Sequence, residues 1–233
     1  MAAGSDRPVF YSFRRCPYAM RARMALASSQ QSVELREIVL RDKPAEMLLA
    51  SPKATVPVLV QSDGSVLEQS LDIMLWALNE NDPHALLRPE IGDLATMLDQ
   101  IATIDGAFKF HLDNYKYASR KAPDGENEAA FAAQNREQAL TSLAPLSEQL
   151  RTQSHLYGNR LSLADVAIAP FVRQFANTDA AWFEAHAPQP LIHWLRVFVE
   201  SPLFSTVMEK HAVWQSGTDG VIYPAPGGGS ESA

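Results

Sequence analysis

Residues 8–29 read PVFYSFRRCPYAMRARMALASS and contain Cys16, which is the one cysteine of the chain. The first six residues are aromatic or β-branched for the most part, and such a short run predicts a strand. The residues from Pro17 onward are good helix formers. A proline suits the first helical position because its missing N–H would have no helical partner there. This stretch therefore predicts a strand, a turn that ends on Cys16 as the N-cap residue, and a helix.

The residues that follow continue the alternation of strand and helix signals up to about residue 80. Asp63-Gly64 is a strong hairpin signal between the last two strands. The order is β-α-β-α-β-β-α, which predicts a mixed sheet covered by helices. The predicted elements after the first helix are a strand at 33–40, a short helix at 43–50, strands at 56–60 and 65–67, and a helix at 69–81.

The rest of the chain has a different pattern. Two prolines in 81–90 indicate a linker, and helical periodicity dominates afterwards. Ser162 and Asp165 stand three residues apart ahead of an apolar run, which is typical of a capping box. The sequence therefore predicts an α/β domain at 7–80, a linker at 81–90, an all-α domain at 91–220, and a low-complexity tail at 221–233 that we expect to be disordered.

The charge and composition of the chain exclude several kinds of partner and cellular location. The chain has 233 residues and a formal net charge of -7, without a long basic run, so nucleic acid and anionic membranes are not expected partners. We see no signal peptide and no apolar run of the roughly 18 residues that a membrane helix needs. A single cysteine allows no internal disulfide, so we expect a cytoplasmic protein. No metal site is predicted.

Cys16 is the candidate reactive group. A sulfur at a helix start faces free N–H groups and the positive end of the helix dipole, and both favour the thiolate. Arg14 and Arg15 act in the same direction unless they point into solvent. The alternative is an inert, buried cysteine, which is the commoner role of this residue type. The position between a strand and a proline favours the reactive interpretation.

Four motifs together resemble the glutathione transferases: CPYA at 16–19, TVPVLV at 55–60, LEQSLDI at 67–73 and LSLADVAIAPF at 161–171. The cysteine at the helix start is similar to that of the omega-type and related bacterial cysteine-containing classes. The resemblance implies a thioredoxin-like domain followed by an all-helical domain. Other classes use a tyrosine late in the first strand or a serine near the first helix, so Tyr11 and Ser12 are rival candidates.

The resemblance also implies a glutathione site. Pro57 corresponds to the cis-proline of the family, which leaves the Val56 backbone able to pair with the cysteinyl part of glutathione. Gln69 and Ser70 match the pair that holds the γ-glutamyl carboxylate at a helix N-terminus. An ordinary helix cap is the alternative for these two. Lys53 lies where the family often has a cation for the glycyl carboxylate, and a solvated loop lysine is the alternative.

The reaction expected from these residues uses one thiol. Ala19 stands where a dithiol enzyme would have its second cysteine, so Cys16 would form a mixed disulfide with glutathione that a second glutathione resolves. Reduction of dehydroascorbate would use the same thiol. Conjugation of glutathione to small electrophiles is the second choice because a thiol is a poor hydrogen-bond donor. A non-catalytic, regulatory binding protein of the same fold is the other class.

We expect an acceptor site between the two domains, because such clefts commonly bind ligands. Arg173 could instead be a surface cation, and Asp105 could face the cleft, a partner subunit or solvent. The resemblance implies a homodimer. The candidate cleft residues are Phe13, Tyr18, Phe108, Tyr115, Arg173 and Trp214.

Overall fold

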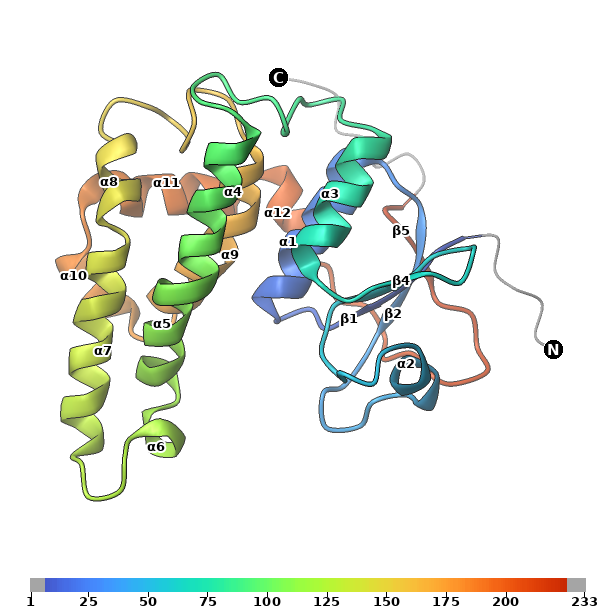
Figure 1. Cartoon of the computed structure of the whole chain (residues 1–233), viewed down its shortest axis with the longest axis horizontal. Coiled ribbons are helices and arrows are strands. Elements are labelled where there is room, and N and C mark those ends of the chain that lie inside the picture. The colour runs from blue at the N-terminus through green and yellow to red at the C-terminus, as the bar shows by residue number, and fades with distance from the viewer. Residues whose placement is uncertain (1–6, 226–233) are drawn as a thin grey trace. The chain divides into compact units, whose positions relative to one another are not determined.

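The computed structural model describes residues 7–225, which form two compact units (Figure 1). Unit 1 combines residues up to His84 with residues from Glu200 onward, and unit 2 spans Ala85–Val199. None of the helices in the described range has both the length and the apolar character needed to cross a bilayer. The residues up to His84 thus do not complete unit 1 on their own, because residues from Glu200 onward also belong to it.

Unit 1 is built on a five-stranded sheet with the order β4-β3-β1-β2-β5. Strands β1 and β2 are parallel, and the other neighbours are antiparallel. The predicted order β-α-β-α-β-β-α of the first 80 residues is confirmed. The strands are β1 (Val9–Ser12), β2 (Val33–Glu37), β3 (Val58–Val60), β4 (Val66–Leu67) and β5 (Val221–Tyr223).

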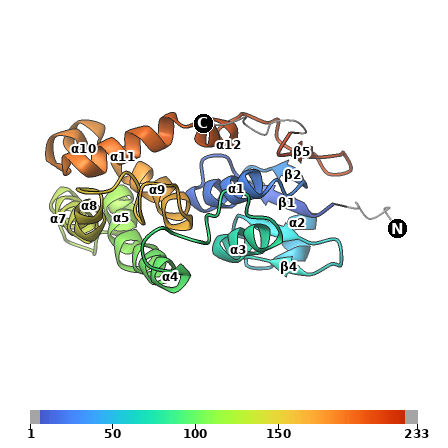
Figure 2. The same cartoon turned by 90° about the horizontal axis from the view of Figure 1, so that it is seen from above.

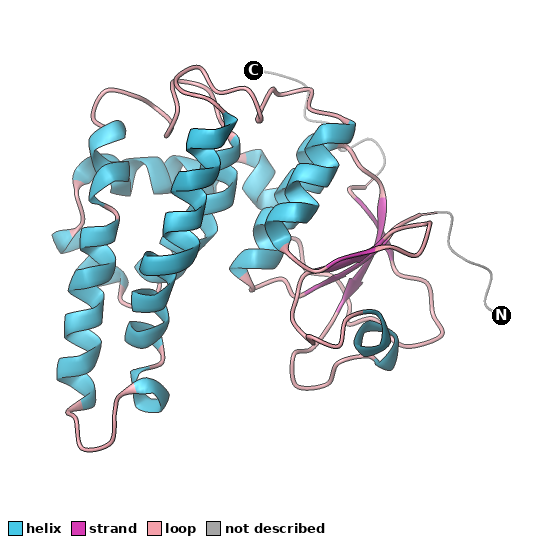
Figure 3. Ribbon diagram, in the orientation of Figure 1, coloured by secondary structure: helices cyan, strands magenta, loops and turns pink. Residues whose placement is uncertain are grey.

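Three helices flank the first four strands. Helices α1 (Pro17–Ser29) and α3 (Ser70–Glu80) pack against each other on one side of the sheet, and α2 (Ala45–Ala50) lies on the other side (Figure 3). Helix α1 is buried along most of its length, and its small residues Ala22 and Ala25 have no exposed surface. Small side chains let α3 and the sheet approach α1 closely, so α1 is the central helix of unit 1.

The C-terminal segment differs from the expectation. Helix α12 (Pro202–Val207) packs on α1, and β5 pairs antiparallel with β2, so that Tyr223 lies opposite Val33 (Figure 1 and Figure 2). Tyr223 is 2% exposed. Residues 221–223 are therefore part of the sheet, because a buried aromatic ring and ladder hydrogen bonds offset the entropy of ordering them. The remainder of the expected disordered tail, 226–233, lies outside the described residues.

Unit 2 is helical. Helix α4 (Leu94–Thr103) continues through the π-helix η1 (Ile104–Phe108) into α5 (Lys109–Lys116), and α9 (Leu163–Ala176) packs against both α4 and α5. Helices α7 and α8 are separated at Leu143. The other helices are α6 (Ala118–Lys121), α7 (Glu128–Ser142), α8 (Ala144–Gln149), α10 (Ala180–His186) and α11 (Gln189–Glu200).

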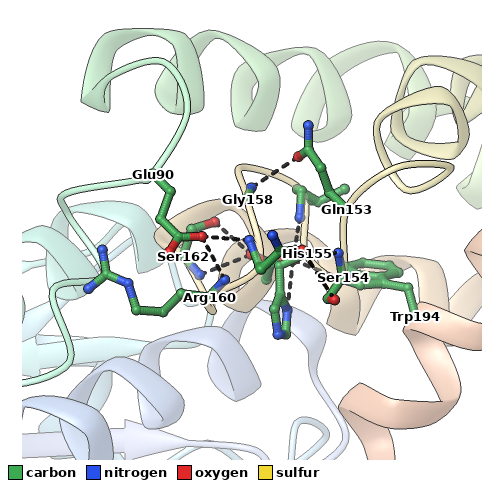
Figure 4. Close-up of polar contacts among 11 residues, drawn as sticks. Glu90, Gln153, Ser154, His155, Gly158, Arg160, Ser162 and Trp194 are labelled. Atoms are coloured by element: carbon green, nitrogen blue, oxygen red, sulfur yellow. Dashed lines mark hydrogen bonds and ion pairs between the residues drawn. The ribbon is translucent and has the colours of Figure 1, made fainter.

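The predicted capping box begins α9 and is buried. Asp165 has no exposed surface, and its carboxylate accepts hydrogen bonds from the Ser162 N–H (3.0 Å) and hydroxyl (2.6 Å). It also accepts from the Leu156 N–H (3.0 Å) and from Nε1 of Trp194 on α11 (2.8 Å). Figure 4 labels two of these donor residues, Ser162 and Trp194. A single carboxylate thus joins the start of α9, the preceding loop and α11.

Candidate functional site

Cys16 is the N-cap residue of α1, as its place before Pro17 predicts. Its backbone is extended (φ -78°, ψ 123°), its N–H donates to the Phe13 carbonyl at 2.9 Å, and its carbonyl accepts from the Met20 N–H at 2.9 Å. The first bond closes a tight turn after β1, and the second is the first bond of the helix. Cys16 is half-buried at the junction of the two.

The sulfur of Cys16 points across to the loop before β3. Sγ lies 3.8 Å from the Val56 carbonyl oxygen, and the peptide bond between Val56 and Pro57 is cis. The sulfur makes no capping bond to the first turn of α1. The S–H group is directed to the Val56 carbonyl instead. The two loops meet at the sulfur.

The rival candidates from β1 are inaccessible. Tyr11 is 2% exposed and Ser12 is 0% exposed. The Tyr11 hydroxyl accepts a hydrogen bond from Nη1 of Arg36 at 2.9 Å, and burial raises the pKa of this phenol. A buried phenol and a buried hydroxyl cannot meet the thiol of a ligand at the surface without rearrangement. Of the three candidates, Cys16 alone is partly exposed.

The start of α3 is the second part of the site. Gln69 is its exposed N-cap residue, and Ser70, the first helical residue, is 3% exposed. Nε of Arg21, a buried residue of α1, donates to the Ser70 hydroxyl oxygen at 2.9 Å. That bond leaves the hydroxyl proton of Ser70 available to a further acceptor, and the free N–H groups of the first turn favour an anion. Lys53 is exposed in the loop before β3.

Two buried charged residues lie beside the Cys16 turn, and neither was expected from the sequence. Arg23 of α1 is 0% exposed and Glu37 of β2 is 8% exposed, and Nη1 of Arg23 lies 3.4 Å from Oε2 of Glu37. The available signal was the spacing: Arg23 follows Cys16 by seven residues, which is about two helical turns, so the two share a face of α1. A charged residue on a buried face requires a partner.

The predicted cleft residues fall into different environments. Phe13 and Tyr18 are half-buried near Cys16, each with an arginine guanidinium over its ring: Arg15 at 5.6 Å and Arg21 at 5.1 Å from the ring centroids. Trp214 differs from the expectation because it is 8% exposed, inside the core of unit 1, with its ring edge-on to Tyr11.

The remaining predicted cleft residues belong to unit 2. Phe108 also differs from the expectation, since it is 0% exposed and packs edge-on against Phe175, with centroids 5.8 Å apart. Large aromatic rings are most often buried where they complete a core. Tyr115 is half-buried against Phe175 as well, and Arg173 is half-buried on α9. Asp105 lies in the π-helix η1. No cluster of three or more metal-ligating side chains occurs among residues 7–225.

Comparison with known proteins identifies the family. The glutathione S-transferase N-terminal domain model matches residues 10–85, and the glutathione S-transferase C-terminal domain model matches residues 128–197. The first match contains the Cys16 turn, the cis-proline loop and the start of α3. The second contains the capping box of α9.

Individual glutathione transferases and related proteins are also similar to this chain. A "Probable maleylacetoacetate isomerase" of Vibrio cholerae is 32% identical over 73% of this chain and 82% of its own length. Glutathione S-transferase omega-1 of Mus musculus is 27% identical over 84% of this chain and 78% of its own length. A glutathione transferase family member from Pseudomonas fluorescens pf-5, solved with two glutathione bound, superposes with a TM-score of 0.75 at 17% identity, covering 88% of this chain and 93% of that one. The chain therefore belongs to the glutathione S-transferase superfamily.

Proposed function

We propose that the protein is a glutathione-dependent thiol transferase in which Cys16 forms a mixed disulfide with glutathione. The observation that carries this proposal is the contact between the Cys16 sulfur and the loop of Val56 and Pro57, at 3.8 Å from the Val56 carbonyl. Tyr11 and Ser12, the rivals, are buried. A glutathione whose cysteinyl backbone paired with Val56 would bring its sulfur beside Cys16.

The remaining parts of glutathione would bind to groups near this loop. The γ-glutamyl carboxylate would take the N-terminus of α3, where Ser70 and the first-turn N–H groups favour an anion. Lys53 would pair with the glycyl carboxylate from its exposed loop. The glutathione present in the Pseudomonas fluorescens structure supports glutathione as the co-substrate here. Dehydroascorbate is a further acceptor that the same thiol would reduce.

The proposed step is a thiol–disulfide exchange. The Cys16 thiolate attacks the glutathionyl sulfur of a mixed disulfide R–S–SG, the Cys16–SG bond forms, and R–S⁻ leaves with the electron pair and takes up a proton. A second glutathione thiolate then attacks the glutathionyl sulfur of Cys16–SG, which releases oxidised glutathione and regenerates the Cys16 thiolate. The sum is R–S–SG + GSH → RSH + GSSG. No second cysteine of the chain is needed.

The test is deglutathionylation of a model mixed disulfide by the wild type and Cys16→Ser. We expect the serine variant to lose at least 100-fold in kcat/KM, on the order of what loss of a covalent nucleophile costs. Mass spectrometry of the wild type incubated with GSSG should show one glutathionyl adduct on Cys16. Full activity of Cys16→Ser would contradict the proposal, and absence of glutathione binding by both forms would favour the non-catalytic binding protein.

A second candidate is an isomerase. The 32% identity with the Vibrio cholerae protein favours it, because this match covers most of both chains. Conversion of maleylacetoacetate by the wild type, followed by absorbance, tests this candidate directly. We propose further that the protein acts as a cytoplasmic homodimer, and a monomeric mass in sedimentation equilibrium would contradict the dimer.

A further inference from the structure

A buried ion pair holds the turn that carries Cys16. Nη2 of Arg23 donates to the Arg14 carbonyl at 2.7 Å, and the Arg14 N–H donates to Oε1 of Glu37 at 2.5 Å. Nη1 of Arg23 lies 3.4 Å from the other carboxylate oxygen of Glu37. Both backbone polar groups of Arg14 are therefore bound by the two members of one pair, two residues before Cys16. Charge-assisted hydrogen bonds of this kind fix a peptide unit firmly.

The pair is costly as a purely structural element. The side chains of Arg23 and Glu37 are 1% and 9% exposed, and Nε of Arg23 is buried without a hydrogen-bond partner in the described chain. Removing two charges from water offsets most of their attraction, so a buried pair contributes little to stability compared with apolar side chains of the same volume. A role other than stability would explain why charged residues occupy these positions.

The charge of Arg23 also interacts with the Cys16 sulfur. Burial lowers the pKa of Arg23, and the negative charges of Glu37, Tyr223 and Cys16 act in the opposite direction. Burial raises the pKa of Glu37, and the Arg14 N–H and the charges of Arg23 and Arg14 lower it. In a buried environment such charges interact over longer distances than in water. The thiolate form of Cys16 is therefore coupled to the charge of Arg23, which Glu37 in turn influences.

We propose that Arg23 and Glu37 are positioning residues for Cys16, which fix the Arg14 peptide units and set the charge behind the sulfur. This inference rests on the proposed function in one respect, namely that Cys16 is the reacting thiol. Arg23 supplies a positive charge that favours the thiolate, and Glu37 moderates that charge. The charges of Arg23 and Glu37 therefore have opposite effects on the thiolate, although both residues hold the same turn.

Other charged and titratable groups surround the pair and enter the test. On the turn itself, Nη1 of Arg14 donates to the Met208 carbonyl at 3.4 Å, and Arg15 is exposed. From the C-terminal segment, the Tyr223 hydroxyl donates to the Arg23 carbonyl at 3.1 Å, and His211 lies edge-on to the Tyr223 ring. Glu209 influences the pKa of both His211 and Tyr223. These groups are the same in all variants below.

The experiment measures alkylation of Cys16 by iodoacetamide between pH 4 and 10, with mass spectrometry as the readout. Because the chain has one cysteine, every cysteine adduct located by peptide mapping reports this sulfur. We expect Arg23→Met to move the midpoint of the pH profile upward by about one unit, which is about tenfold in rate at a pH below both midpoints. We expect Glu37→Gln to move the midpoint downward, and the double variant to lie near the wild type. A purely structural role would move both single variants in the same direction.

Matched variants make the result specific. Arg36→Met removes a partly buried ion pair with Glu34 on the same strand, and Arg15→Gln removes an exposed cation next to Cys16. We expect both to shift the midpoint by less than about 0.3 unit, since screening weakens exposed charges. The proposal would be overturned if the controls shifted the midpoint as much as Arg23→Met and Glu37→Gln do. It would also be overturned if Arg23→Met and Glu37→Gln shifted the midpoint in the same direction. Circular dichroism checks that each variant is folded.

The alkylation experiment still gives an answer if one variant does not fold or if the proposed function is wrong. If Arg23→Met does not fold, Glu37→Gln alone decides, because an unchanged or higher midpoint contradicts the proposal. Alkylation needs no glutathione, so failure of the proposed function would show separately, as full transferase activity in Cys16→Ser. The alkylation profiles would in that case still report whether Arg23 and Glu37 control the thiol.

Discussion

At the scale of single residues, Ser70 links α1 to the proposed glutathione site. Arg21 donates to its hydroxyl oxygen at 2.9 Å, which orients the hydroxyl proton away from α1. We expect Ser70→Ala to raise the KM for glutathione about tenfold with little change in kcat, because a hydrogen bond to a carboxylate contributes about 1.5 kcal/mol or more. Steady-state kinetics with glutathione as the varied substrate checks this.

The control for that variant is Ser65→Ala in the hairpin between β3 and β4. The Ser65 hydroxyl is exposed and donates to Asp63 within the hairpin. We expect its KM for glutathione to equal that of the wild type. Similar KM values in Ser70→Ala and the wild type would exclude the α3 N-terminus as the carboxylate site.

Protonation of the His211 ring should make the stability of the protein depend on pH. Burial lowers its pKa, and the charge of Arg23 acts in the same direction, while Glu209 opposes both. The folded protein therefore prefers the neutral ring, so stability is lost as the pH falls from the unfolded value of about 6.5 through the lower folded value. We expect the urea midpoint of the wild type to fall more between pH 7.5 and 5.5 than that of His211→Gln. The exposed His193, changed to Gln, should leave the wild-type pH dependence in place.

At the scale of elements, two capping boxes in unit 2 differ in burial. The carboxylate of Asp165 at the start of α9 is fully buried with four donors, whereas that of Asp93 at the start of α4 is exposed and accepts from the Thr96 N–H at 2.8 Å. We expect Asp165→Ala to lower the free energy of unfolding by about 3–5 kcal/mol, since several buried donors lose their acceptor. Asp93→Ala should lower it by about 1 kcal/mol. Urea unfolding followed by circular dichroism measures both, and equal losses would contradict this account.

The elements also show what local sequence can predict. The helix start at Cys16, the hairpin at Asp63-Gly64 and the capping box at Ser162 follow from residues adjacent in the chain, and all three were expected. The strand at Val221–Tyr223 was not expected, because its partner β2 lies almost 200 residues earlier and three residues carry no usable periodicity. Arg23 can be buried because it pairs with Glu37, which belongs to another element. Helix and strand propensities of neighbouring residues do not reveal such a pairing.

At the scale of the whole molecule, unit 1 depends on both ends of the chain. Trp214 packs in the core with Tyr11 and Val56, and its backbone N–H donates to the Glu37 carbonyl at 2.8 Å. Strand β5 covers the edge of β2. We expect a chain that ends at Met208 to lose at least 3 kcal/mol of stability, since removal of one buried tryptophan alone costs about that much. Hydrogen exchange of the β2 amides should become faster.

The control chain ends at Ala225 and retains every contact named here. We expect its β2 amides to exchange as slowly as those of the full-length chain. Slow exchange in the chain that ends at Met208 would mean that β5 adds no protection to β2. The Cys16 alkylation profile of the same truncated chain would report whether the C-terminal segment also holds the Arg23–Glu37 pair.

Unit 1 consists of two separate parts of the chain, so unit 2 is synthesised in full before unit 1 is. Residues 85–199 make up the whole of unit 2, whereas unit 1 also contains residues from Glu200 onward, which include α12, Trp214 and β5. Since domains fold as units while the ribosome elongates the chain, the helical unit can be complete before the unit that precedes it in the sequence. During that interval β2 is an open strand edge, of the kind that pairs with other chains. We therefore expect the edge of β2 to stay open to such pairing until β5 has been synthesised.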